Sequence, residues 1–516
     1  MAAYRPPLGL RSLLLLAGLA APLAAPAALA QPGPASTLRI GLADDADALD
    51  PTLSRTYVGR IIFAGLCDKL FDIDAKLNVV PQLATGYEYT DPQTMVIKLR
   101  PGVTFHDGEA FDSAAVKFSL ERHLTMQGST RRGEINVIDR IETPDPLTVK
   151  LHLKAPSSPL LIQLTDRSGM VVSPKAATAL GADFSKAPVC TGPFKFAERV
   201  PQDRIVLDRY EGYWNKDAIK LGRVVYRPII DATVRLANLQ ANALDFGERF
   251  QPSDTAEIKK DSRLVLVQNA GLGFQSLLFN HTNGPRPRTP MMTDARVRQA
   301  FALSIDRTVI NEVVYAGMQT PNPHFVSPDS PFWSAEVKAP ARNVARAKQL
   351  LAEAGVRTPL AVELMLANNP DLRQTGEVIQ SMAAEAGFDV KIRSTEFVTA
   401  LQASDKGDYE VFLIGWSGRA DADGNVYSFT HTGPPNLNAA GYSNAQVDGW
   451  LDEARRISGM PERRALYTKV AQQLMADLPR MYLYTPNNIF AMTTRVRGFI
   501  PVPDGLIRLH GMSLTP

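Results

Sequence analysis

The chain has 516 residues, of which 45% are hydrophobic and 21% are charged, and its formal net charge is +3. This composition is typical of globular proteins and excludes both a disordered chain and a very small scaffold held by disulfides. The near balance of charge, with no long run of one sign, argues against a nucleic-acid partner held by counterion release.

Residues 1–30 predict a secretory signal peptide. They contain no acidic residue and two arginines, and their apolar run is interrupted by Pro22 and Pro26. A retained membrane anchor needs about twenty uninterrupted apolar residues, so we expect cleavage after Ala30 instead. The mature chain is then expected in the periplasm.

The two cysteines, Cys67 and Cys190, both lie in the part expected to be exported. An oxidising compartment allows such a pair to form a disulfide, which we expect here. The alternative is two separate buried thiols that act as small hydrophobic side chains. A zinc site is disfavoured because neither cysteine has another cysteine or a histidine nearby.

The first half of the chain reads as mixed strands and helices. Residues 37–43 alternate as a strand, residues 60–71 have apolar positions at helical spacing, and residues 78–153 read as strands and turns around one helix at 112–123, for which Asp112 supplies the cap. Further strands are expected at 204–207, 222–229, 264–269 and 274–280, with a helix at 231–244.

A second block of alternating elements begins near Asp294. Residues 294–315 predict one long amphipathic helix, and further helices are expected at 341–355, 378–387 and 461–478. Strand-like segments lie at 360–366, 389–395, 409–416 and 480–492. Such alternation predicts an α/β protein built in more than one layer.

No catalytic signature is present. The nearest candidate for a nucleophile elbow surrounds Ser417, but its second glycine, Gly418, stands one position too early. The seven histidines are scattered, with no pair at the spacing of a helical metal site. We therefore expect no catalytic residue, no metal and no cofactor.

Five segments in series carry a resemblance to a known family. They are DKLFDIDAKLNVVPQLATGYE (68–88), IKLRPGVTFHDGEAFDSAAVKFSLER (97–122), CTGPFKF with DRIVLDRYEGYWN (190–215), DATVRLANLQ (231–240) and DARVRQAFALSIDR (294–307). Together they resemble the extracytoplasmic solute-binding proteins of peptide-type ABC importers, family 5, which includes oligopeptide-, dipeptide-, glutathione- and nickel-binding proteins.

The resemblance implies an α/β, two-lobed periplasmic binding protein, a type II-like clamp with an inserted subdomain in the first lobe. We expect the first lobe at 36–277, including the inserted subdomain at about 78–188, the second lobe at 278–484 and a return to the first lobe at 485–516. The two hinge crossings are expected at 273–280 and 482–488, where extended apolar segments carry glycine or proline.

The resemblance also implies where a ligand is held. In the oligopeptide- and dipeptide-binding members, an aspartate three positions after a tryptophan pairs with the α-ammonium group of the ligand. Here Trp416 is followed at that spacing by Arg419. Either Asp421 or Asp423 then receives the amine, or Arg419 holds a ligand carboxylate. The alternative is an Arg419 side chain turned to solvent or paired with Asp421.

The remaining candidate ligand residues are Tyr57 and Arg167 in the first lobe and Phe274 near a crossing. The function expected is capture of a short or modified peptide and its delivery to a membrane permease, by a protein that acts as a monomer. A non-peptide solute such as a glutathione-like compound or a metal chelate, an exported peptide or cell-wall hydrolase, and a receptor that presents its ligand to another partner remain alternatives.

Overall fold

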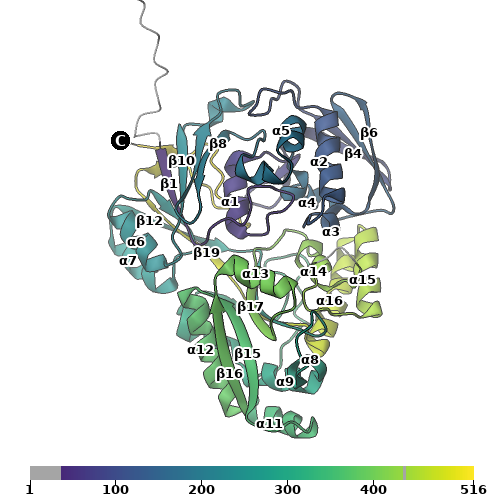
Figure 1. The fold of residues 1–516 in the computed structure, drawn as a ribbon, viewed down its shortest axis with the longest axis vertical. Coiled ribbons are helices and arrows are strands. Elements are labelled where there is room, and N and C mark those ends of the chain that lie inside the picture. The colour runs from purple at the N-terminus through teal and green to yellow at the C-terminus, as the bar shows by residue number, and fades with distance from the viewer. Residues whose placement is uncertain (1–36, 434–436, 516) are drawn as a thin grey trace, which may run out of the picture.

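The computed structural model describes residues 37–433 and 437–515, which form three main sheets with their covering helices (Figure 1). The expected signal peptide at 1–30 lies outside the described residues. Within the described ranges, no helix is both long and apolar enough to span a membrane.

The first sheet has seven strands in the order β12-β19-β11-β1-β10-β9-β8. Its central strand β1 runs parallel to β10 and β11, while the remaining pairs are antiparallel. The strands are β1 (Thr37–Leu42), β8 (Phe194–Val200), β9 (Arg204–Arg209), β10 (Arg223–Pro228), β11 (Phe246–Gly247), β12 (Leu264–Ala270) and β19 (Asn487–Thr493), with helices α1 (Tyr57–Leu66), α5 (Pro174–Leu180), α6 (Ala232–Gln240) and α7 (Thr255–Lys260). The parallel centre leaves the carboxyl ends of β1 and β11 at one edge.

A four-stranded antiparallel sheet, in the order β4-β5-β7-β6, is inserted between the strands of the first sheet. Its elements are β4 (Ala84–Asp91), β5 (Thr94–Leu99), β6 (Ile138–Asp145), β7 (Thr148–Leu153), α2 (Ser113–Thr125), α3 (Arg132–Ile135) and α4 (Leu160–Gln163), preceded by the pair β2 (Phe71–Ile73) and β3 (Val79–Pro81). As the sequence indicates, Asp112 caps α2 by accepting from the Ala115 amide at 2.9 Å.

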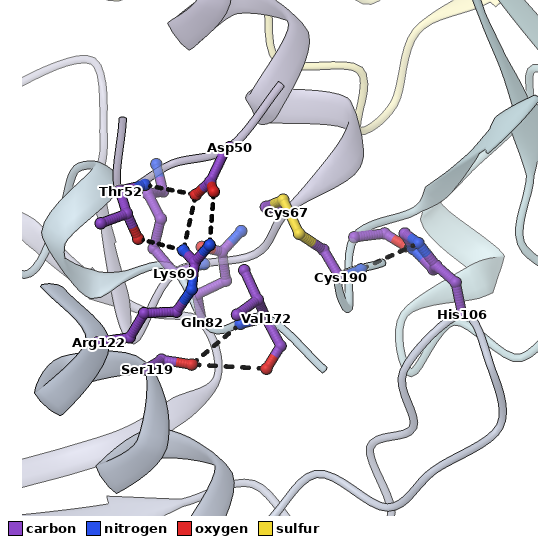
Figure 2. The surroundings of a disulfide bond; sticks show 11 residues. Asp50, Thr52, Cys67, Lys69, Gln82, His106, Ser119, Arg122, Val172 and Cys190 are labelled. Carbon is purple, nitrogen blue, oxygen red and sulfur yellow. Dashed lines mark hydrogen bonds and ion pairs between the residues drawn. A yellow bond between two sulfur atoms is a disulfide. The ribbon is translucent and has the colours of Figure 1, made fainter. Parts of the chain in front are cut away.

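A disulfide joins Cys67, directly after α1, to Cys190, shortly before β8, with their Cα atoms 4.9 Å apart. It closes a loop with a sequence separation of 123, for which chain-entropy models give about 4 to 5 kcal/mol of stabilisation. Figure 2 shows His106 beside Cys190, whose amide donates to the His106 ring at 3.3 Å. The disulfide therefore joins the two chain segments between which the inserted region lies, and both cysteines pack in the core of the first sheet.

The second sheet has six strands in the order β14-β18-β13-β17-β15-β16, with β15 parallel to β16 and β17. The strands are β13 (Phe274–Phe279), β14 (Thr320–Pro321), β15 (Leu360–Ala367), β16 (Phe388–Thr395), β17 (Val411–Trp416) and β18 (Arg480–Thr485). The helices are α8 (Pro290–Thr293), α9 (Ala295–Ser304), α10 (Arg307–Tyr315), α11 (Val344–Glu353), α12 (Pro370–Glu385), α13 (Phe397–Asp405), α14 (Asp423–Thr430), α15 (Ala445–Arg456) and α16 (Met460–Asp477), and the chain ends with β20 (Val496–Arg497) and β21 (Ser513–Leu514).

The single long helix expected at 294–315 is wrong, because two helices, α9 and α10, occupy it. The chain is extended at Ile305, and the Asp306 carboxylate accepts from the amides of Thr308 and Val309 to start α10. Apolar periodicity runs through both helices and hides the break. The cap at Asp306 is the local signal for it.

The chain passes between the first and the second sheet twice. Between β12 and β13 it does so at residues 271–273, and between β18 and β19 at Pro486. The first change precedes the boundary expected at 277, since all of β13 is hydrogen-bonded within the second sheet. Figure 1 shows the first and inserted sheets on one half of the molecule and the second sheet on the other.

Candidate ligand-binding site

A cleft with a volume of about 270 Å³ lies between the two halves of the molecule. It opens at the carboxyl ends of parallel strands, which are β1 and β11 in the first sheet and β15 and β17 in the second sheet. Open α/β sheets bind ligands at such carboxyl ends. Both sheet changes, at 271–273 and Pro486, form part of its wall.

Aromatic side chains supply much of the cleft wall. They are Tyr57, Phe250, Phe274, Tyr315, Phe397, Trp416 and Tyr484. Phe274 and Trp416 stand opposite each other on the paired strands β13 and β17, so the sheet register places both at the cleft. The Tyr57 hydroxyl donates to the Gly505 carbonyl oxygen at 2.6 Å, and burial raises the pKa of Tyr57 well above its usual range.

One cation in the cleft, Arg249, is already balanced by the protein. Its guanidinium contacts Asp44 at 3.0 Å and Glu248 at 2.7 Å, and it lies over the Tyr57 ring at 5.2 Å. Glu248 is fully buried and also accepts from the Ala43 amide at 2.7 Å. These contacts fix Arg249 at the cleft wall while leaving a polar surface for a ligand.

One carboxylate in the cleft, Asp371, has no ion pair within the described ranges. It stands at the start of α12, where Asn369 caps the helix, and accepts a hydrogen bond from Gln251 across the cleft. Burial raises the pKa of Asp371 to about 6, since the nearby Asp254 and Asp231 reinforce the effect and Arg235 only partly opposes it.

The residues of the loop after β17 lie in two different places, some in the cleft and some outside it. Trp416 and Ser417 line the cleft, but the chain then turns at Gly418, whose φ is +81°. A Cβ at Gly418 would lie 2.2 Å from the backbone of Leu272, so only glycine fits this turn. The turn directs the following residues away from the cleft.

Arg419, Asp421 and Asp423 all lie beyond that turn and do not line the cleft. Arg419 is only 5% exposed; it donates to the Gly418 carbonyl oxygen at 2.8 Å and pairs with Asp166 at 3.5 Å. It is therefore neither turned to solvent nor paired with Asp421. The two aspartates are paired elsewhere, Asp421 with Arg463 at 2.8 Å and Asp423 with Arg455 at 2.7 Å.

Arg167 also lies outside the cleft lining. It is fully buried and donates to the Ser54 carbonyl oxygen at 2.6 Å, and its Nε lies 3.3 Å from Asp166. Of the seven residues expected to touch the ligand, the structure thus brings Tyr57, Phe274 and Trp416 together in the cleft. The other four serve contacts between protein groups.

Contacts between the halves show that the structure is closed. Arg60 of α1 donates to Ser417 Oγ at 2.9 Å, and Ser158 donates its amide to the Arg455 carbonyl oxygen at 2.8 Å. Arg455 also donates to the Gly133 carbonyl oxygen at 3.3 Å. The two halves are therefore in direct contact beside the cleft.

Sequence reasoning missed several polar residues of the cleft, which are Arg249, Gln251, Asn369, Asp371, Asn487 and Asn488. Asn369 and Asp371 directly follow the apolar strand β15, and the rule that ligands bind at the ends of parallel strands was the signal that could have found them. Arg249 follows the two-residue strand β11, which is too short to be recognised from the sequence.

The described residues contain no group of three His, Cys, Asp or Glu side chains that could hold a metal ion. Two α/β halves that close over a cleft beside two chain crossings define the class of two-lobed solute-binding proteins.

Residues 78–436 match the sequence model of a protein family, the bacterial extracellular solute-binding proteins, family 5 Middle. This match covers more than half of the chain, which therefore belongs to the family 5 bacterial extracellular solute-binding proteins. The predicted family, the two-lobed α/β fold and the function as a substrate-binding component of an ABC transporter are confirmed.

Relatives span nearly the whole chain. The glutathione-binding protein GsiB of Pectobacterium atrosepticum is 29% identical over 480 residues, covering 91% of this chain and 92% of the relative. The periplasmic binding protein AgaA of A. tumefaciens R10, solved with agropinic acid, is 28% identical with a TM-score of 0.84, covering 93% and 99% of the two chains. DppA of Helicobacter pylori, solved with the peptide STSA, is 24% identical with a TM-score of 0.86, covering 93% and 98%, and shows the shared fold.

Proposed function

We propose that this protein captures a short or modified peptide, of about the size of glutathione, and delivers it to the permease of an ABC importer. The observation that carries the proposal is the closed cleft of about 270 Å³, with aromatic walls and a carboxylate, Asp371, that has no protein cation within the described ranges. The relatives named as glutathione-binding proteins support a ligand of this size.

Each cleft residue has a role in this proposal. Trp416, Phe274 and Tyr57 cover the apolar parts of the ligand, and Asp371 receives its ammonium group. Arg249 offers N–H groups to a carboxylate. The amine site thus moves from the position of Arg419, where peptide-binding members carry an aspartate, to the start of α12.

The remaining expectations follow from the same function. The protein acts outside the cytoplasm as a monomer, after removal of residues 1–30, and performs no covalent chemistry. Because both lobes line the cleft, ligand shifts the population toward the closed state.

The deciding experiment is mass spectrometry of the solute released when protein purified from its native periplasm is denatured. We expect a short or modified peptide that carries an amine. A solute without an amine, such as a sugar acid, would contradict the role of Asp371, and a product altered by the protein would favour an enzyme. Small-angle scattering on the stripped protein should show a smaller radius of gyration when the recovered solute is returned.

A further inference from the structure

Outside the cleft, one buried group of side chains carries an imbalance of charge. The seam cluster consists of Arg60, Asp166, Arg167 and Arg419, which meet where the two halves of the molecule touch. Their exposed fractions are between 0% and 5%. Arg60 donates to Asp166 at 2.8 Å, while the Nε atoms of Arg167 and Arg419 lie 3.3 and 3.5 Å from the same carboxylate.

Three guanidinium groups thus share one carboxylate. The other acids nearby are engaged by further arginines: Glu134 pairs with Arg131, and Asp504 pairs with Arg508 at 2.7 Å. Burial lowers the pKa of Arg419 only to about 10, so this side chain stays charged at neutral pH. A positive charge taken out of water is costly unless an anion balances it.

The hydrogen bonds of the seam cluster are also incomplete. Arg419 Nε and Nη2 and Arg167 Nη2 are buried and have no hydrogen-bond partner in the part of the chain that the structure describes. A charged donor left without an acceptor costs more than a neutral one. Arg419 therefore keeps two buried donor atoms without an acceptor, and it shares the Asp166 carboxylate with two other arginines.

A small cavity lies at this position. Its lining includes Arg60, Arg419 and Leu272 together with two carboxylates, Asp166 and Asp504, the second of which is paired with Arg508. Its volume of about 10 Å³ has room for one water-sized particle. Leu272 also lines the large cleft, so the cavity lies directly behind the cleft wall. The cavity thus combines space, positively charged guanidinium groups and N–H donors without an acceptor.

We propose that this cavity binds a small anion, a halide or a carboxylate group, between Arg60 and Arg419. The anion comes either from solution or from the captured solute, and the second source rests on the proposed function. Arg60 and Asp166 belong to the half with the first and inserted sheets, whereas Arg419 follows β17 of the second. The site is complete only when the halves meet, so the anion favours the closed state.

The experiment uses bromide as the probe. Crystals of the full mature protein are grown in sodium methanesulfonate, which is neither a halide nor a carboxylate. They are soaked in sodium bromide, and anomalous scattering is recorded at the bromine edge. We expect a peak between Arg60 and Arg419. A cavity that holds only water, with no bromide peak, would overturn the proposal.

Thermal unfolding in solution gives the second measurement. Replacing methanesulfonate by bromide at constant ionic strength should raise the Tm of the wild type with saturation, and Arg419→Gln should weaken this response at least tenfold in bromide concentration. The matched control is Arg298→Gln, because Arg298 is a buried arginine of α9 that donates to the carbonyls of Met291 and Met292, away from the seam cluster. The same response in all three proteins would contradict a site at Arg419.

Glutathione added to bromide-soaked crystals separates the two sources. Loss of the bromide peak on binding means that a ligand carboxylate occupies the cavity, and a retained peak means that the anion is independent of the ligand. Either result keeps the site. If glutathione does not bind while bromide does, the proposed ligand fails and the anion site stands.

Discussion

The large cleft and the seam cluster lie on either side of the same loop, and they differ in how far their side chains are paired with other protein groups. In the cleft, the side chains of Trp416 and Asp371 keep surface that other protein groups do not fully cover or pair with. In the seam cluster, Arg60, Asp166 and Arg419 are engaged with one another and bridge the two halves. This comparison supports our proposals that the cleft recognises the ligand and that the seam cluster stabilises contact between the halves.

One glycine separates the two regions. Gly418 approaches the backbone of Leu272 so closely that no side chain fits, and the turn there sends Trp416 to the cleft and Arg419 to the seam. Residues three positions apart therefore serve different purposes. Substitution in each region should change different measurements.

The largest expected effect follows from removing the carboxylate of the seam cluster. Asp166→Asn leaves Arg60, Arg167 and Arg419 buried without their shared anion, and loss of one partner of a buried ion pair costs about 3 to 5 kcal/mol. Burial alone would raise the pKa of Asp166, but the arginines outweigh it and hold that pKa well below its usual range, so the loss is present at neutral pH. Chemical denaturation measures it.

The control for this variant is Asp183→Asn, which removes a solvent-exposed partner of Lys186. Its denaturation midpoint should equal that of the wild type, because exposed pairs contribute little. If Asp166→Asn also unfolds at the wild-type midpoint, the seam cluster does not stabilise the protein and the comparison fails.

A cleft variant should act mainly on binding. Trp416→Ala removes an aromatic wall and should weaken binding of the solute recovered from the native protein by about 10- to 100-fold, the equivalent of burying one large apolar side chain. Calorimetry gives the affinity. Trp333→Ala is the matched control, because Trp333 is also half-buried but packs in the core of the second half, outside the cleft lining.

Trp416 also packs against Phe429 at 4.8 Å and against Arg419, so its variant loses some stability as well. The two tryptophan variants should therefore both unfold earlier, while only one binds weakly. Equal affinities would remove Trp416 from the ligand site.

The sequence predicts the fold well because family-wide signatures and apolar periodicity depend on many residues at once. The segment at 482–488, where the second crossing is expected, contains Pro486, at which the chain passes from β18 of the second sheet to β19 of the first. The break between α9 and α10 was not predicted, because two extended residues, Ile305 and Asp306, do not disturb the apolar pattern of a helix.

The site is predicted less completely than the fold. Phe274 and Trp416 follow from strand register, but the direction of the Arg419 side chain depends on a close approach between Gly418 and Leu272, which are far apart in the sequence. Likewise, the partners of Asp421 and Asp423 are arginines of later helices, Arg463 and Arg455. Pairings of this kind are set by tertiary packing and leave no local pattern.

The smallest expected effect concerns the pH dependence of the cleft carboxylate. The pKa of Asp371 is raised to about 6 by burial, with Asp254 and Asp231 adding to the shift, Arg235 opposing it and Gln251 donating to the carboxylate. A ligand ammonium binds the ionised form. Affinity for an amine-bearing solute should therefore rise about tenfold between pH 5 and pH 7, the worth of one charge-assisted hydrogen bond, and Asp371→Asn should make it independent of pH.

Stability of the ligand-free protein should change in the opposite direction. A carboxyl group whose pKa is higher in the folded state stabilises the protein fully below its unfolded pKa of 3.8, and this contribution is lost as the pH rises through about 6. At pH 8, Asp371→Asn should accordingly be more stable than the wild type while it binds the solute more weakly. Denaturation and calorimetry on the same two proteins test both signs together. If the variant is less stable at pH 8, or if its affinity still rises with pH, then Asp371 has a structural role and the ammonium group of the ligand lies elsewhere in the cleft.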